Sequence, residues 1–278
     1  MAVLGVGLLG ASFARALRKH SLAEHVSGTG RREENLRRAR DLGYIDSYSL
    51  SPEEACQDAD LVVLAAPVES FTALARKIAP ALKKGALLID VGSVKGRLVG
   101  ELEGLMPEGV SFVGCHPIAG SERSGIDASS AELFEGAFCV VTPTERTPGE
   151  AIEDVVRLWR TLGAQVEVLD PEVHDRVYAV LSHFPHAAAY ALAAGAGRLR
   201  EEHWKFAGQG FLDATRIALS SPELWSNICL LNRENLLACM EAFRSDMDDI
   251  RGCLDRSDLE GLKRIFERGR DVRQGLGD

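Results

Sequence analysis

A glycine-rich turn within the first ten residues constrains this chain more than any other feature. It reads Gly5-Val6-Gly7-Leu8-Leu9-Gly10, a G-x-G-x-x-G pattern, and it joins a short apolar run at 1–4 to a segment at 8–19 whose apolar residues have helical spacing. In such a strand–turn–helix unit the glycines allow a tight turn and close approach of the backbone to a pyrophosphate. The pattern predicts a dinucleotide site, although an ordinary tight turn before a helix has the same signature.

Strand-like and helix-like segments alternate up to residue 169. The apolar run at 61–67, closed by Pro67, is typical of a strand buried on both faces of a parallel sheet, and the run at 86–90 repeats it. The sequence therefore predicts an α/β domain over residues 1–169, a Rossmann-type doubly wound parallel sheet. Further strands are expected at 26–30, 111–113, 137–141 and 165–169, and helices at 31–42 and 148–162.

The pattern becomes helical after residue 169. Asp170-Pro171 suits the start of a helix, and the periodicity then predicts an all-helical domain over residues 170–278. The apolar run at 187–196 exceeds what the helical domain of one chain could bury, so we expect a homodimer that pairs through these helices. The helices are expected at 173–199, 207–220, 222–254 and 259–270.

Charge and cysteine content narrow the class of protein. With 32 Lys+Arg and 41 Asp+Glu the net charge is -9, which argues against nucleic acid and anionic membranes as partners. The six cysteines form no C-x-x-C pair or zinc-site spacing, and no basic-then-apolar leader precedes the glycine turn. The most apolar stretch, 179–197, contains Ser182, His183 and His186, which favours a buried helix over a membrane span. We therefore expect a cytoplasmic protein.

The end of the second expected strand bears on cofactor choice. An NAD site usually has a carboxylate there for the ribose hydroxyls, whereas this chain reads Thr29-Gly30-Arg31-Arg32. Paired arginines suit a 2′-phosphate, so the sequence predicts NADP as the preferred cofactor and NAD as the alternative, unless Arg31 and Arg32 are only the solvated start of a helix. The other predicted cofactor residues are Gly5, Gly7, Leu8, Leu9, Gly10, Ala66 and Pro67.

Two loops that follow expected strands contain candidate catalytic residues. Residues 90–96 form a polar loop with Ser93 and Lys95, and residues 114–125 form a loop rich in glycine and serine with His116 just beyond a strand end. The carboxyl ends of parallel strands are where such sheets bind ligands. Alternatively, Ser93 caps the next helix and His116 is an ordinary loop histidine.

Together these pieces resemble the prephenate/arogenate dehydrogenase family, the cyclohexadienyl dehydrogenases of tyrosine biosynthesis. The resemblance rests on the glycine turn, on the two loops, on Leu181-Ser182-His183-Phe184-Pro185-His186, and on Asp213-Ala214-Thr215-Arg216-Ile217-Ala218 followed by Trp225. It covers nearly the whole chain. It implies oxidative decarboxylation of prephenate or arogenate with NAD or NADP, on a Rossmann domain joined to a helical dimerisation domain.

The resemblance also implies roles for individual residues. It makes His116 the base for the substrate hydroxyl and Ser93 a hydrogen-bonding partner near the same hydroxyl, and it pairs Arg216 with a substrate carboxylate. We lean towards prephenate as substrate, although Glu122, Asp127 or Asp213 could face the ammonium group of arogenate. The remaining predicted substrate-binding residues are Ser121, His174, Ser182 and His186.

Other functions fit part of this pattern. A 3-hydroxyacid dehydrogenase or an imine reductase usually centres on a lysine of the helical domain, where this chain offers histidines and an arginine. A regulator that binds the dinucleotide without catalysis is a further alternative. His183-x-x-His186 could place two metal ligands on one helix face, but without an evident third ligand we predict no metal.

Overall fold

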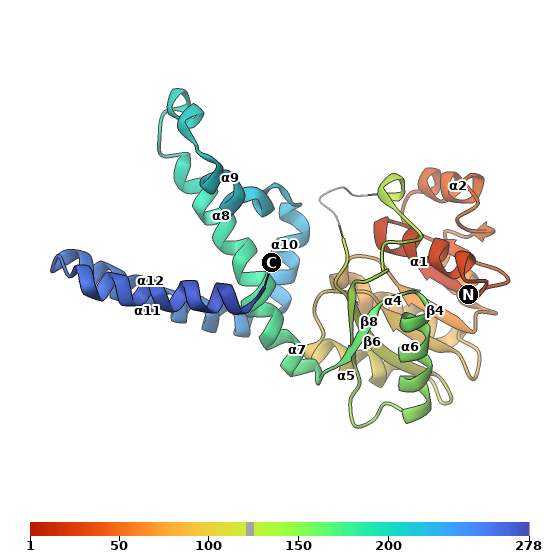
Figure 1. Cartoon of the computed structure of the whole chain (residues 1–278). Helices are drawn as coiled ribbons and strands as arrows, with labels where there is room; N and C mark the ends of the chain where they lie inside the picture. The colour runs from red at the N-terminus through yellow and green to blue at the C-terminus, as the bar shows by residue number, and fades with distance from the viewer. Residues whose placement is uncertain (121–124, 278) are drawn as a thin grey trace. The chain divides into compact units, whose positions relative to one another are not determined.

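The computed structural model describes residues 1–120 and 125–277 of the chain. They form two compact units, Met1–Asn232 and Arg233–Asp278. The first unit holds a β-sheet, the helices that cover it and a further helical segment, whereas the second consists of two long helices (Figure 1).

An eight-stranded sheet forms the base of the first unit, in the order β3-β2-β1-β4-β5-β6-β7-β8. The chain starts in the middle of the sheet at β1, extends outward to β3, and then returns to β4 on the other side of β1. This doubly wound topology confirms the predicted fold class. The strands are β1 Ala2–Leu4, β2 Ser27–Thr29, β3 Ser47–Tyr48, β4 Leu61–Leu64, β5 Leu87–Asp90, β6 Ser111–Pro117, β7 Phe138–Thr142 and β8 Gln165–Val168.

Helices cover both faces of the sheet (Figure 1). Successive residues of β4 point to opposite faces, so Val63 packs in one core with α1 and α6 while Val62 and Leu64 pack in another with α4 and α5. Because both faces are buried, the strand has no polar position, which explains its continuous apolar sequence. The helices are α1 Leu8–Lys19, α2 Glu33–Asp41, α3 Pro52–Cys56, α4 Phe71–Ile78, α5 Gly96–Leu105 and α6 Gly149–Thr161.

Strand β6 departs from the sequence-based expectation. It runs from Ser111 to Pro117 instead of ending at Val113, and its second half pairs antiparallel with β7, with His116 opposite Val140. The prediction that His116 lies in a loop beyond a strand is therefore wrong, and the sheet is not parallel throughout. The added pairing with β7 keeps β6 extended after its parallel pairing with β5 ends at Val113.

The helical part of the first unit begins as predicted. The carboxylate of Asp170 accepts hydrogen bonds from the backbone N–H groups of Glu172 and Val173, at 2.9 and 3.0 Å, and Pro171 occupies the first turn. The single helix expected at 173–199 is instead divided by a π-helical turn, η4 (Ala179–His183). Pro185, which has no N–H to donate, follows this turn directly. The helices are α7 Pro171–Tyr178, α8 Phe184–Ala196, α9 Gln209–Thr215 and α10 Pro222–Leu231.

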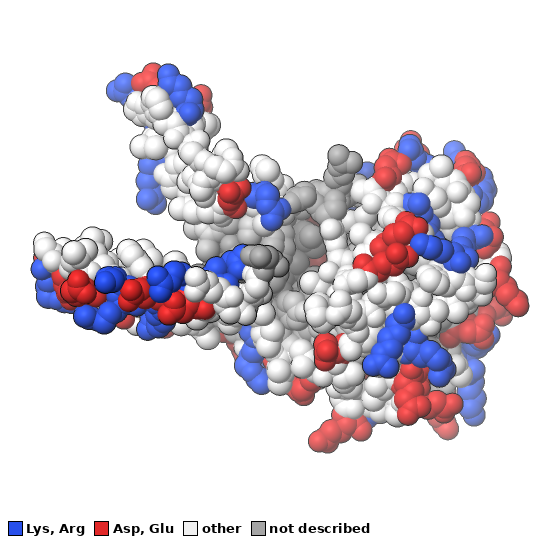
Figure 2. All heavy atoms as spheres, viewed as in Figure 1, with Lys and Arg blue, Asp and Glu red and all other residues white. Residues whose placement is uncertain are grey.

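The second unit is a helical hairpin of α11 (Arg233–Asp255) and α12 (Leu259–Gly275), which lie side by side (Figure 1). Asp258 caps α12 by accepting a hydrogen bond from the Gly261 N–H at 2.8 Å. Charged side chains gather along one side of the hairpin (Figure 2). Its exposed apolar side chains include Leu237, Met240, Phe243, Met247, Leu254, Leu259, Phe266 and Val272.

Candidate active site

The turn between β1 and α1 has room only for glycine at two positions. Gly5 has φ +108°, and a Cβ there would lie 2.5 Å from the backbone nitrogen of Ala66. A Cβ on Gly10 would lie 2.1 Å from the carbonyl oxygen of Gly5, so α1 could not pack as closely. A Cβ on Gly7 would meet nothing within 4 Å, and no side chain caps α1 at that residue. The turn therefore leaves open space at a helix N-terminus, as a pyrophosphate requires.

A cavity of about 600 Å³ extends from this turn along the carboxyl ends of β1, β2 and β4. It is lined by six of the predicted cofactor residues, whereas Leu8, Leu9 and Gly10 do not line it. Sequence reasoning missed Asn35, Glu69 and Ser70, which lie beyond the motif in the next helical segments. The predicted residues in the lining are Gly5, Gly7, Arg31, Arg32, Ala66 and Pro67.

Arg31 and Arg32 follow β2 and are exposed at the mouth of this cavity. Neither forms an ion pair with another described residue, whereas Arg37 on the same segment pairs with Glu33 at 3.2 Å. Two guanidinium groups that lack an internal carboxylate partner are suited to bind an external anion.

His116 is buried and lies against α7, the first helix after the sheet. Its Nδ1 is 2.9 Å from Nε2 of His174, and Nδ1 of His174 is 2.8 Å from Oδ1 of Asp175. The ring of Tyr178 packs on both imidazoles, with centroid distances of 4.8 Å to His116 and 4.5 Å to His174. The sheet and α7 thus meet through a line of three hydrogen-bonded side chains.

A buried ion pair lies near these histidines, and its Lys95 lowers the pKa of both. Asp90, at the end of β5, pairs with Lys95, and its carboxylate also accepts the backbone N–H groups of Gly92 and Cys115, both at 2.9 Å. The Lys95 N–H donates to Asp175 Oδ1 at 2.8 Å. Ser93 lies in this same loop, beside the strand that bears His116. It does not cap α5, for which no side-chain cap is present.

The other predicted substrate residues gather around α8. His186 Nδ1 is 3.0 Å from the carbonyl oxygen of Ser182, and the His186 ring stacks on Trp225 with centroids 3.3 Å apart. Arg216, in η6 (Arg216–Leu219), is exposed and near enough to His186 to lower the pKa of that imidazole. His183 Nδ1 is 3.0 Å from the side-chain nitrogen of Asn232.

Burial keeps these imidazoles neutral. Desolvation is the largest cause that lowers the pKa of each, and His174 and Lys95 lower the pKa of His116 further. The pKa of His183 falls from 6.5 to about 4. Its Nε2 has no hydrogen-bonding partner within the described ranges, although the backbone of Ser93 lies near enough to raise that pKa. A neutral imidazole can accept a proton at neutral pH.

The structure therefore brings His116, His174 and the loop of Ser93 together, and Ser182, His186 and Arg216 form a neighbouring group. His183 connects the two groups electrostatically, because it influences His116 and is itself influenced by His186. Ser121 and Glu122 lie outside the described residues. Of the carboxylates considered for an ammonium group, Asp127 pairs with Arg38 at 2.6 Å and Asp213 accepts from Gln209 at 2.7 Å.

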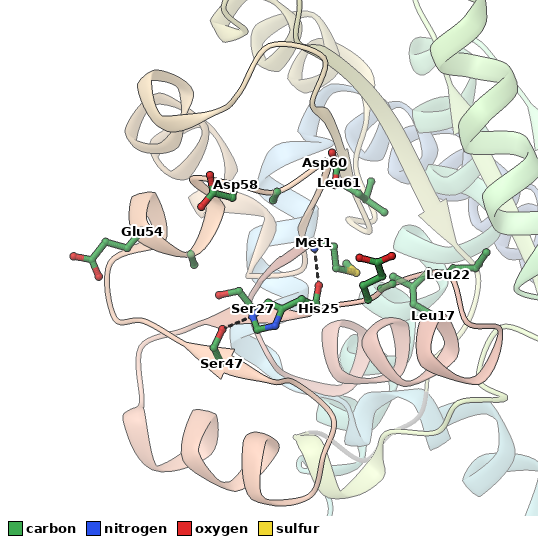
Figure 3. A pocket seen from close by; sticks show the side chains of 14 residues that line it. Met1, Leu17, Leu22, His25, Ser27, Ser47, Glu54, Asp58, Asp60 and Leu61 are labelled. Atoms are coloured by element: carbon green, nitrogen blue, oxygen red, sulfur yellow. Dashed lines mark hydrogen bonds between the residues drawn. The ribbon is translucent and has the colours of Figure 1, made fainter.

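A second cavity, of about 780 Å³, lies at the opposite edge of the sheet (Figure 3). It is lined by Met1, Ser27 and Leu61, at the amino ends of β1, β2 and β4. Its other polar groups include the carboxylates of Asp58 and Asp60. Ligands of doubly wound sheets bind at the carboxyl ends of the strands, so this cavity is not the candidate active site.

Neither a metal cluster nor a membrane span was found in the part of the chain that the structure describes. No three His, Cys, Asp or Glu side chains there are grouped to hold a metal ion. His183 and His186 instead contact Asn232 and the Ser182 carbonyl. None of the described helices has both the length and the apolar character needed to cross a bilayer.

Two protein-family models match the chain. The model for the nucleotide-binding domain of prephenate dehydrogenase matches residues 13–168, and the model for its dimerization domain matches residues 170–268. Together they account for most of the sequence.

Characterised relatives and solved structures agree with these models. The chain is 35% identical to prephenate dehydrogenase of Bacillus subtilis, over 98% of this chain and 74% of that protein. It is 34% identical to cyclohexadienyl dehydrogenase of Zymomonas mobilis, over 99% and 95%. The crystal structure of A. aeolicus prephenate dehydrogenase with hydroxyphenyl propionate and NAD+ has a TM-score of 0.92 and 36% identity, and covers 99% of this chain and 97% of that one.

Proposed function

The chain belongs to the prephenate dehydrogenase family, and from that premise we propose that it oxidatively decarboxylates prephenate to 4-hydroxyphenylpyruvate in tyrosine biosynthesis. The observation that carries this proposal is the burial of His116 against His174, which holds a neutral imidazole between the two parts of the chain that the family models match. The alternatives, a 3-hydroxyacid dehydrogenase, an imine reductase or a non-catalytic regulator, are not favoured by the relatives.

The reaction requires a base that returns its proton. The nicotinamide cofactor, when bound, accepts a hydride from the ring carbon that bears the hydroxyl. His116 accepts the hydroxyl proton as carbonyl character develops there. Departure of the ring carboxylate as carbon dioxide leaves its bonding electrons in the ring, which becomes aromatic. His116 then gives the proton back to the phenolate oxygen, so no net proton is released.

We assign the remaining roles as part of the same proposal. Ser93 donates a hydrogen bond that orients the substrate hydroxyl, and Arg216 pairs with a substrate carboxylate. Ser182 and His186 line the space beside Arg216, which is supported by the contact of His186 with the Ser182 carbonyl oxygen and by the effect of Arg216 on the pKa of His186. Ser121 stays a predicted substrate contact. Arogenate stays a possible second substrate, because neither Asp127 nor Asp213 is held away from solvent.

Domain organisation, assembly and location complete the proposal. We place the nucleotide-binding domain at 1–169 and the substrate and dimerisation domain at 170–278, and we propose that the chain forms a homodimer. The exposed apolar side chains of α11 and α12 support this assembly, since a pair of helices with so little buried surface needs a partner. The six free thiols fit the cytoplasm.

An absorbance assay tests the proposed function directly. Purified protein incubated with prephenate and NADP or NAD should produce the reduced cofactor and 4-hydroxyphenylpyruvate together. Arogenate in place of prephenate measures the second activity. The absence of a signal with either substrate and either cofactor would contradict the proposal.

Cofactor preference gives a second prediction. NADP is proposed as the preferred cofactor because Arg31 and Arg32 line the cavity and have no carboxylate partner among the described residues. Replacing both by alanine should raise the KM for NADP about 10- to 100-fold, which corresponds to a combined loss of about 1.5–3 kcal/mol of charge-assisted hydrogen bonding by the two exposed side chains. The KM for NAD should change less than about twofold.

Arg37 supplies the matched control for this pair. It lies on α2, which begins directly after Arg32, but it pairs with Glu33, so Arg37→Ala should leave both KM values unchanged. Equal weakening of NADP and NAD by the double replacement would show that Arg31 and Arg32 are only a solvated surface.

A further inference from the structure

His174 has a bonding pattern that a substrate contact does not explain. The side chain is completely buried, and both ring nitrogens are engaged, Nε2 with His116 at 2.9 Å and Nδ1 with Asp175 at 2.8 Å. No polar atom of the ring is left for a ligand. We propose that Asp175 and His174 are positioning residues that fix the tautomer of His116, so that His116 Nε2 carries the lone pair that accepts the substrate proton. This inference rests on the proposed function.

The direction of each hydrogen bond follows from the carboxylate. Oδ1 of Asp175 already accepts the backbone N–H of Lys95 at 2.8 Å, and an ionised carboxylate can only accept. Nδ1 of His174 must therefore carry the hydrogen. In a neutral imidazole the other nitrogen is then an acceptor, so His174 Nε2 accepts and His116 Nδ1 donates. One carboxylate thus determines the protonation pattern of two rings.

Packing holds the rings in this geometry. Tyr178, one turn after His174 on α7, contacts both imidazoles, with centroids 4.5 Å from His174 and 4.8 Å from His116. Rotation of either ring would disturb this contact. Asn232 adds a hydrogen bond to the Asp175 carbonyl oxygen at 2.8 Å, which ties down the backbone that bears the carboxylate.

The arrangement assists both directions of proton transfer. Burial lowers the pKa of His116 and His174, so both rings are neutral at pH 7, as the pattern requires. When His116 Nε2 takes the hydroxyl proton, Nδ1 keeps its hydrogen and its bond to His174. The positive charge is then stabilised by the acceptor nitrogen of His174, which Asp175 in turn polarises. Returning the proton from Nε2 to the phenolate oxygen restores the starting pattern.

Two measurements test the proposal: NMR spectra of protein with isotopically labelled histidine, recorded for the wild type and for Asp175→Ala, and the steady-state kinetics of Asp175→Ala. In the wild-type protein we expect a protonated Nδ1 and an unprotonated Nε2 for His116, with the signals assigned by their loss in His116→Asn. Without the carboxylate, His174 can donate from Nε2, which drives His116 towards protonation at Nε2. The kcat should fall about 10- to 100-fold, because a His116 protonated at Nε2 cannot accept the substrate proton, while KM for prephenate stays within about twofold.

Two conservative variants and one control sharpen the test. Asp175→Asn retains an oxygen that can accept from Lys95 and His174, so it should restore much of the lost kcat. His174→Gln keeps an acceptor for His116 and should remain at least about tenfold more active than His174→Phe, which keeps none. Asp170→Ala is the control, because Asp170 caps the same helix without contacting either imidazole. It should lower the melting temperature and leave kcat unchanged.

Several results would overturn the inference. They are an Nε2-protonated His116 in the wild-type protein, an unchanged tautomer in Asp175→Ala, or equal losses of kcat in His174→Gln and His174→Phe. If Asp175→Ala does not fold, the comparison of kcat between His174→Gln and His174→Phe decides whether His174 positions His116. The NMR measurement needs no substrate, so failure of the prephenate assay would contradict the proposed function without deciding the tautomer.

Discussion

Replacing His116 by asparagine should lower kcat about 10²- to 10⁴-fold, the range for loss of a general base. Asparagine cannot take up the hydroxyl proton, but its amide can still donate to His174 Nε2, which the native ring contacts at 2.9 Å. The buried partner therefore stays satisfied and the fold should be retained. The dissociation constant for NADP should change little, because His116 does not line the cavity at the glycine turn.

The pH dependence of the wild-type enzyme extends this prediction. Burial, His174 and Lys95 lower the pKa of His116 well below 6.5. A base is active in its neutral form, which persists above its pKa, so kcat/KM should stay level through pH 6.5 and decline only at lower pH. That acidic decline should disappear from the residual activity of His116→Asn.

The exposed His203 provides the control for this measurement. It lies in η5 (Glu201–Phe206), far along the chain from the proposed site residues of the sheet, and its side chain is about half exposed. His203→Asn should retain full activity and the wild-type pH profile. An acidic decline centred at or above pH 6.5, or normal turnover by His116→Asn, would contradict the role of His116 as base.

The nucleotide-binding half could be predicted because its constraints are local. The φ of +108° at Gly5 is a requirement of that residue's own backbone, and a Cβ on Gly10 would overlap the carbonyl oxygen of Gly5, so both requirements appear directly as glycine in the sequence. The run at β4 is apolar without interruption because helices cover both faces of the sheet. A helix start such as Asp170-Pro171 is likewise determined by the few residues that form it.

Features that depend on distant residues could not be predicted in this way. Strand β3 has only two residues, which are too few to produce a recognisable pattern. The single long helix expected at 222–254 is instead two helices, because α10 ends at Leu231 and α11 begins at Arg233. Between them Asn232 turns its side chain towards Asp175 and His183, which are 57 and 49 residues away. The tertiary contact overrides the helical periodicity there.

The contact between His116 and His174 is the clearest example in the candidate site. The two residues are 58 positions apart and come from a strand and a helix. The sequence did contain two signals: Cys115 and the residues before it extend the apolar run of β6 towards His116, and Asp175 directly follows His174. Neither signal reveals that the second imidazole meets the first, since pairing between β6 and β7 is needed to hold His116 in place.

Of the changes considered, removal of one partner of the buried Asp90–Lys95 ion pair should lower the stability of the protein most. Asp90 and Lys95 are each about 1% exposed, and Asp90 is the partner that compensates the buried ammonium group. Asp90→Ala would leave that charge unpaired and release the N–H groups of Gly92 and Cys115. Removing one partner of a buried pair costs about 3–5 kcal/mol, so the urea midpoint should fall strongly. Measurements need a fixed protein concentration, because the stability of a dimer depends on it.

Lys95→Met should be less harmful than Asp90→Ala. Methionine fills most of the lysine volume, and the carboxylate left behind still accepts two backbone N–H groups at 2.9 Å, which stabilise a buried negative charge. The ammonium left by Asp90→Ala has no such substitute in its described surroundings. The order of the two urea midpoints therefore tests whether the backbone N–H groups of Gly92 and Cys115 stabilise Asp90. If Lys95→Met proves the less stable variant, the carboxylate of Asp90 depends on Lys95 rather than on those backbone donors.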